Sequence, residues 1–198
     1  MKVTREQMAE NRGRILDAAG KLFRARGFDG VSVAEIMAAA GLTHGGFYGH
    51  FESKDALIAA ALAHVLDPER AAGRGKSMAD YGATYLSAAH RDDHAGGCPF
   101  SALGSEAVRT NPEARQVMTD AIERQIARFS ATAPGATPKA RRRAAIAGWA
   151  AMVGGVILSR IADDPALANE ILKATKAELA DAVSVTRPSL SPSPHGRA

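Results

Sequence analysis

The residues with the most reactive side chains lie together in one short segment, HRDDHAGGCPF, at positions 90–100. It contains Cys98, the only cysteine of the 198-residue chain. Pro99 suits the first position of a helix, so we expect Cys98 to be the N-cap of that helix. A thiol at a helix N-terminus is biased toward the thiolate, which reacts with oxidants and electrophiles. Gly96 and Gly97 would let the chain approach closely here.

Three other interpretations of this segment stay open. The thiol could be small, buried and inert. His90, His94 and Cys98 are spaced by four and could bind a metal from one helix face, although the glycines and the proline interrupt such a helix. In a thiol-dependent hydrolase, Cys98 would be the nucleophile, a histidine the base, and Asp92 or Asp93 its orienting group. Residues clustered in one loop give a poor geometry for that triad.

A second segment, THGGFYGHF at 43–51, has no catalytic pattern but an unusual composition for a helix. Glycine costs roughly 1 kcal/mol against alanine inside a helix. Gly45, Gly46 and Gly49 therefore need a reason. Our interpretation is that this helix brings its backbone very close to another molecule.

The elements that position these segments are predicted to be helical throughout. Hydrophobic residues make up 46% of the chain, enough for a substantial core, and they recur at helical rather than alternating spacing. Glycine, proline and capping residues separate the predicted helices. We expect an all-α fold with helices at about 11–26, 33–40, 44–50, 54–65, 77–91, 99–110, 112–131, 138–161 and 165–185.

The predicted helices at 33–40 and 44–50, joined by a turn at 41–43, match a helix-turn-helix. Ser32 and Glu35 form a capping-box pattern, and Thr43 is expected to cap the following helix. In such a motif the second helix lies in the DNA major groove with its first residues at base edges. An alternative is a plain three-helix packing unit. In both interpretations Phe47 and Phe51 face inward.

The region 10–62 resembles the DNA-binding domain of TetR-family transcriptional regulators. The resemblance is specific there and weak in the remainder of the chain. The matching positions, in chain order, are Ala19, Leu22, Phe23, Gly27, Phe28, Ser32, Val33, Ile36, Ala40, Gly41, Leu42, Thr43, Tyr48, His50, Phe51, Lys54 and Leu57.

The resemblance implies which residues contact DNA. Phosphate contacts would come from Ser32, Thr43, Tyr48, His50 and Lys54, and base contacts from His44, Gly45 and Gly46. His44 stands where the family often has lysine, and Gly46 and Gly49 replace larger residues. Because few side chains remain to contact bases, we expect recognition to depend on His44, close backbone approach and DNA shape. A basic arm before the first helix, with Lys2, Arg5, Arg12 and Arg14, could add contacts or be an ordinary solvated terminus.

The resemblance also implies that the rest of the chain binds a small-molecule inducer and forms a homodimer. The dimer would pair helices 145–161 and 165–185 in a four-helix bundle; the alternative is a core helix within one subunit. The candidate pocket residues are Tyr81, Tyr85, Cys98, Phe100, Met118, Trp149 and Met152. The predicted division is a DNA-binding domain at 1–52, a ligand-binding and dimerisation domain at 53–186, and a disordered tail at 187–198.

Charge and composition constrain the function further. The net charge is +4, which suits an acidic partner without proving one. No apolar run reaches the ~18–20 residues that span a bilayer, since the longest candidate, 144–158, contains three glycines. We therefore expect a cytoplasmic protein with no membrane contact, no cofactor, no bound metal and no catalytic residue. The leading hypothesis is a repressor released from a palindromic operator by an inducer or by Cys98 modification; the alternative is a constitutive, architectural DNA-binding protein.

Overall fold

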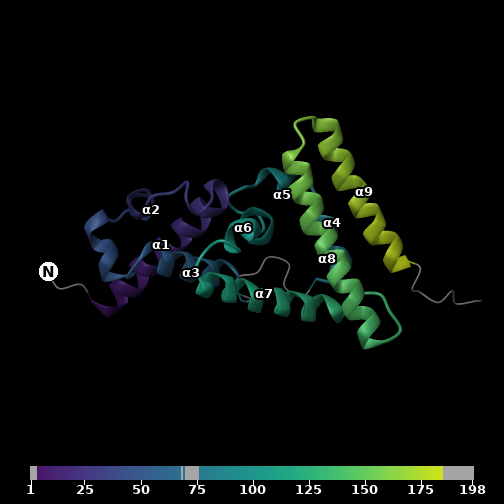
Figure 1. Cartoon of the computed structure of the whole chain (residues 1–198), viewed down its shortest axis with the longest axis horizontal. Coiled ribbons are helices and arrows are strands. Elements are labelled where there is room, and N and C mark those ends of the chain that lie inside the picture. Colours follow the sequence, from purple (N-terminus) through teal and green to yellow (C-terminus); the bar gives the residue numbers. More distant parts are fainter. Residues whose placement is uncertain (1–3, 68, 70–75, 185–198) are drawn as a thin grey trace, which may run out of the picture.

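The structure, a computed structural model, describes residues 4–67, 69 and 76–184 and contains helices and no strand in those ranges, as the sequence predicted. Figure 1 shows α1, α2 and α3 together at one end of the molecule and the long α8 and α9 side by side at the other. The helices are α1 Arg5–Arg26, α2 Val33–Ala39, the 3-10 helix η1 His44–Gly49, α3 Lys54–Val65, α4 Met78–Tyr85, α5 Ala88–Asp92, α6 Pro99–Ala107, α7 Pro112–Ser130, α8 Pro138–Ile161 and α9 Pro165–Ser184.

Side-chain caps mark several helix starts. Ser53 accepts a hydrogen bond from Ala56 N–H, and Thr137 accepts one from Ala140 N–H, each at the start of the predicted helix. Ser32 and Glu35 form the predicted capping box. These bonds satisfy backbone N–H groups that have no partner within their helix.

The prediction of a single helix at 77–91 is wrong. Leu86 leaves the helical conformation, with ψ at 64°. Ser87 then starts α5 by accepting a hydrogen bond from His90 N–H at 3.2 Å. Apolar spacing continues through this break, so periodicity alone did not show it. The predicted disordered tail at 187–198 lies outside the described residues.

Helix α8 is the longest and is packed between α7 and α9. The three glycines that were expected to break its apolar run do not interrupt the helix. By length and composition alone, α8 could therefore span a bilayer, although a core helix of a water-soluble protein shares those properties. Only 39% of its apolar 18-residue window is buried within the chain. One face of α8 is thus both apolar and uncovered.

Two buried apolar clusters form the core. The first joins α1, α2, η1 and α3 to α6 and α7, and includes Phe23, Phe47 and Leu103. The second lies among α4, α7, α8 and α9, and includes Phe129 and Met152. Phe100 of α6 packs against both clusters. The first cluster crosses the boundary predicted at residue 52, so the N-terminal helices share their core with the body.

Candidate functional site

The segment 43–51 forms the 3-10 helix η1 instead of the α-helix expected at 44–50. Gly46 N–H donates to Thr43 O at 3.1 Å, in the tighter pattern of a 3-10 turn. Thr43 stands at the N-cap position, but its hydroxyl makes no capping hydrogen bond, so that prediction was wrong. Three glycines in six residues weaken the preference for an α-helix, which is the physical reason for the difference.

Two phenylalanines hold η1 against the core, as predicted. Phe47 and Phe51 are buried and stack with their ring centroids 5.9 Å apart. Tyr48 packs edge-on against Phe47 at 5.2 Å, yet it is 73% exposed. A large aromatic side chain is therefore fixed at its base and open to solvent at its hydroxyl end.

The glycines of η1 are not required by the fold itself. None of them has a positive φ, so each backbone conformation suits any residue. A Cβ built at Gly45 or Gly49 meets no atom within 4 Å, and one at Gly46 meets only Met37 and Thr43 at 3.7 and 3.9 Å. The free protein would accept side chains here. Their absence leaves an open, flat backbone surface next to Tyr48.

The other predicted DNA-contact residues surround this surface. Ser32, Thr43 and His44 are exposed, and His50 and Lys54 are half-buried. The Ser32 hydroxyl donates to Glu35 at 2.8 Å and accepts from Glu35 N–H. Hydrogen bonds from Ser32, and then from Arg26, lower the pKa of Glu35 to about 2. The hydroxyl of Ser32 is thus already engaged within the capping box.

Arg12 has a structural role that the sequence did not reveal. It belongs to α1 together with Arg5 and Arg14, so the expected basic arm is a helix from Arg5 onward, and Lys2 lies outside the described residues. Arg12 donates to His50 O at 2.7 Å, and its guanidinium lies 4.1 Å from the centroid of the Phe51 ring. A contact between residues 38 positions apart leaves no local signal in the sequence.

A second feature is a cavity of about 780 Å³ between the N-terminal helices and the body. Among the predicted pocket residues, Tyr81, Tyr85, Cys98, Phe100 and Trp149 line it. Met118 and Met152 do not line this cavity: they are buried, one in each apolar cluster, where their flexible side chains fill the core. Those two residues therefore lie outside this cavity. The lining also includes charged and polar residues that the sequence analysis did not single out, among them Arg24, Arg124 and Gln125.

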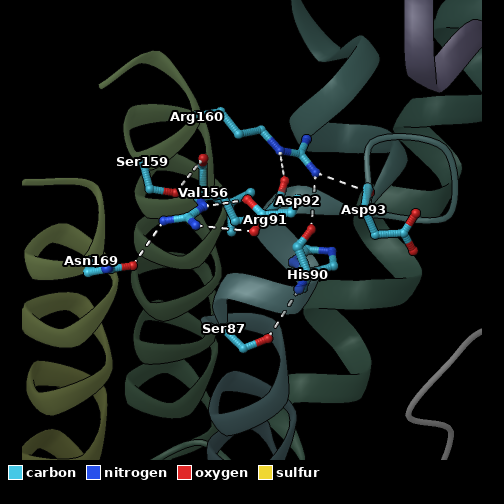
Figure 2. Close-up of polar contacts among 9 residues, drawn as sticks. All are labelled: Ser87, His90, Arg91, Asp92, Asp93, Val156, Ser159, Arg160 and Asn169. Carbon is cyan, nitrogen blue, oxygen red and sulfur yellow. Dashed lines mark hydrogen bonds and ion pairs between the residues drawn. The ribbon is translucent and has the colours of Figure 1, made fainter. Parts of the chain in front are cut away.

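The loop before Cys98 is held by α5 and α8 (Figure 2). Arg160 donates to the backbone oxygens of Arg91, His90 and Asp93 at 2.9, 3.2 and 3.4 Å. Gly97 N–H donates to Asp93 O at 2.9 Å, and the tight turn leaves no room for a Cβ at Gly97, as predicted. Cys98 is the N-cap of α6, and the thiol is half-buried.

Both ring nitrogens of His90 face backbone groups. Cys98 N–H donates to Nε2 at 3.1 Å, so the proton on the ring lies on Nδ1, 2.8 Å from Tyr85 O. Burial lowers the pKa of His90, which favours this neutral form. His90 is therefore placed neither to deprotonate the thiol nor to ligate a metal. Within the described ranges, no three His, Cys, Asp or Glu side chains are grouped for metal binding.

The cavity is electrostatically unusual. Burial lowers the pKa of Arg24, opposed by the nearby Asp93 and Cys98. Burial, and then the neighbouring Cys98, raises the pKa of Tyr85, which stays protonated. The Tyr85 hydroxyl and the Gln125 side-chain nitrogen are buried with no hydrogen-bond partner in the part of the chain that the structure describes. Such atoms are uncommon in folded proteins and mark places where a ligand can bind.

Comparison with known proteins finds relatives of the N-terminal helices and of the whole fold. The sequence profile of the bacterial regulatory proteins of the tetR family matches residues 15–61. The transcriptional regulator TtgR of Pseudomonas putida is 39% identical over 59 residues, 30% of this chain and 28% of TtgR. AcrR of Shigella flexneri is 42% identical over 55 residues, 28% of this chain and 26% of AcrR. The chain thus matches little more than a quarter of the length of these curated relatives.

Solved structures extend the similarity to the whole fold. A TetR transcriptional regulator from Chloroflexus aurantiacus superposes with a TM-score of 0.71 at 29% identity, over 90% of this chain and 96% of that one. The reduced form of Escherichia coli NemR gives 0.66 at 20% identity, over 86% and 95%, and shows the fold alone. Fold and surface together define a helix-turn-helix protein with a helical body. Residues 15–61 match the tetR family of bacterial regulatory proteins, and the chain as a whole has the fold of a TetR transcriptional regulator.

The role of Arg12 can be tested by Arg12→Met, which keeps the apolar stem and removes the charge. Losing the hydrogen bond to His50 O and the contact with Phe51 should lower the free energy of unfolding by about 1 kcal/mol in urea titrations. Lys21→Met, which changes an exposed cation of the same helix, should stay within about 0.5 kcal/mol of the wild type. Equal stability of the two variants would contradict the assignment.

Proposed function

We propose that this protein is a homodimeric, sequence-specific DNA-binding repressor that a small molecule releases from a palindromic operator. The observation that carries the proposal is the open glycine surface of η1 beside the exposed Tyr48. The fold does not require glycine at these three positions. A partner whose surface approaches the backbone closely would require it. Duplex DNA is such a partner, because backbone N–H groups at the start of a helix suit its phosphates.

Few side chains on this surface can distinguish bases. His44 is exposed at the first position of η1, and the two residues after it are glycines. We therefore assign base contact to His44, phosphate contact to Tyr48 and Lys54, and the remaining specificity to DNA shape. Binding in the cytoplasm, where the DNA lies, follows from this function.

The uncovered face of α8 supports the homodimer. Ile146, Leu158 and Ile161 are large apolar residues exposed along it, and Leu167 of α9 is exposed nearby in sequence. A Cβ at Gly154, on the same helix, would meet open space. Bulky and small residues alternating on an apolar face suit close packing against a second copy, as a two-fold axis requires. A dimer also supplies the two η1 segments that a palindromic operator needs.

Two contacts provide a route from the cavity to the DNA surface. Arg24 of α1 donates to Ala95 O at 2.6 Å, in the loop before Cys98. At the other end of α6, the Glu106 carboxylate accepts from Phe28 N–H at 2.7 Å, just after α1. A ligand that displaces α6 or Arg24 would tilt α1 and change the spacing of the two η1 segments. DNA affinity falls if the ligand binds the released spacing more tightly.

Modification of Cys98 is a second means of release within the same mechanism. The thiol is half-buried and lines the cavity at the first turn of α6. A group attached to its sulfur would occupy cavity volume next to Phe100 and act as a tethered ligand. The unmodified protein would then bind DNA, and the modified protein would be released.

The glycine surface predicts that Gly45→Ala leaves the free protein intact and impairs DNA binding. The free energy of unfolding should not fall, because the added methyl group meets open space, whereas DNA affinity should drop about tenfold or more from a steric clash. Affinity is measured by fluorescence anisotropy on a duplex recovered from a random pool. Gly104→Ala, a matched change in the body at an equally open glycine of α6, should alter neither property.

The same titrations distinguish residues that contact phosphates from the residue that contacts bases. Tyr48→Phe and Lys54→Ala should weaken binding similarly on all duplexes, and His44→Ala should change the preference among them. Wild-type affinity in Gly45→Ala and in these three variants would contradict the proposed DNA surface. Binding that depends on salt and is indifferent to sequence would instead favour the architectural alternative.

The dimer face predicts that Leu158→Asp gives a monomer. Leu158 is 56% exposed in the single chain, so the charge costs little there but disrupts an apolar interface. Sedimentation velocity should show twice the chain mass for the wild type and the single chain mass for the variant. Ile122→Asp, which alters an exposed apolar residue of α7, should remain dimeric. A dimeric Leu158→Asp protein, or a monomeric wild type, would contradict the proposed dimer interface.

A further inference from the structure

The inducer class can be inferred from the chemistry of the cavity wall, on the basis of the proposed ligand-released function. The first observation is a pair of unsatisfied donors. Tyr85 is 4% exposed, lines the cavity, and its hydroxyl has no hydrogen-bond partner among the described residues. The Gln125 side-chain nitrogen, on α7, is also buried and has no hydrogen-bond partner among the described residues. Both are hydrogen-bond donors, so their natural complement is an oxygen acceptor on the occupant.

The second observation is the charge of the lining. Arg24 reaches the cavity from α1 and Arg124 from α7, and Arg128 and Lys76 also line it. The one acidic side chain of the described lining, Asp17, lies 2.6 Å from His64, an ion-pair partner when that histidine is protonated. An excess of cations facing a partly desolvated space attracts an anion and repels a cation.

The third observation is the aromatic composition of the apolar wall. Phe100 and Trp149 meet edge to face with centroids 4.9 Å apart, and Tyr81 stacks on Tyr85 at 5.3 Å. Aromatic side chains from α4, α6 and α8 therefore line one space. Rings of this kind pack most favourably against another planar ring.

We infer that the cavity binds a planar aromatic carboxylate. Its ring packs against the aromatic wall, its carboxylate faces the arginines, and an oxygen accepts hydrogen bonds from Tyr85 and Gln125. A neutral aromatic compound would leave the excess positive charge of the lining without compensation. An aromatic cation would meet at least three like charges. The volume of about 780 Å³ is in the range of clefts and cavities that hold one drug-sized compound.

The test compares matched acids and amides on the purified full chain. Benzoate, 2-naphthoate and biphenyl-4-carboxylate are titrated by calorimetry, each beside its primary amide, which keeps the ring and removes the charge. At least one acid should bind at least tenfold more tightly than its amide. Trp149 is the only tryptophan, so 5-fluorotryptophan labelling gives a fluorine resonance from the cavity alone. That resonance should shift with the acid.

Two variants test whether the acid binds in the cavity. Tyr85→Phe removes only the hydroxyl, and Arg124→Gln removes only an exposed charge at the cavity; each should weaken the acid about tenfold. Arg115→Gln, a matched change of an exposed arginine elsewhere on α7, should leave affinity within twofold. Because Arg124 is exposed, its variant stays informative even if Tyr85→Phe lowers stability.

Two results would overturn the inference: no acid binds, or an amide binds as well as its acid. DNA binding of the same preparation is measured in parallel. If the dimer binds a palindrome but binds none of the acids, only the inferred ligand class is contradicted. A protein that binds no specific DNA overturns the proposed function instead.

Discussion

The structure depends on α1 being shared between the DNA-facing end and the body. Its buried residues Ile15, Ala19 and Phe23 belong to the same apolar cluster as Leu103 of α6 and Met118 of α7. Arg12 and Arg24 lie on this one helix, about 18 Å apart at the usual helical rise. Arg12 holds the backbone of the segment after η1, and Arg24 holds the loop before Cys98. The two contacts are thus joined by one continuous helix.

Helix α6 makes the complementary connection at the centre of the molecule (Figure 1). It is nine residues long, begins at the Cys98 cap and ends beside Glu106, which holds the backbone just after α1. Its Phe100 packs on both apolar clusters and also lines the cavity. A compound in the cavity therefore contacts a side chain on which both halves of the core depend. Close-packed cores shift between discrete arrangements, and this property makes such a contact useful for switching.

Much of this arrangement was predictable from local chemistry, and the rest depends on contacts that only the fold creates. The Ser32 and Glu35 capping box marked the start of α2 correctly, because a cap bonds to its own first turn. Phe47 and Phe51 were identified as buried from their spacing. The break at Leu86 and the packing of Met118 and Met152 away from the cavity wall depend on tertiary packing, for which sequence spacing carries no signal. The DNA contacts of the residues around η1, and the predicted boundary at residue 52, stay predictions.

Selection of bound duplexes from a random DNA pool tests the central claim most directly. The purified protein is first unfolded and refolded to remove any bound small molecule, and the selection is made at near-physiological salt. The account predicts an enriched palindrome whose half-site centres lie about 10 base pairs apart or at a multiple of that spacing, as two η1 segments on one face of the duplex require. A folded, dimeric protein that enriches no sequence would contradict the assignment of η1 as a DNA-recognition element.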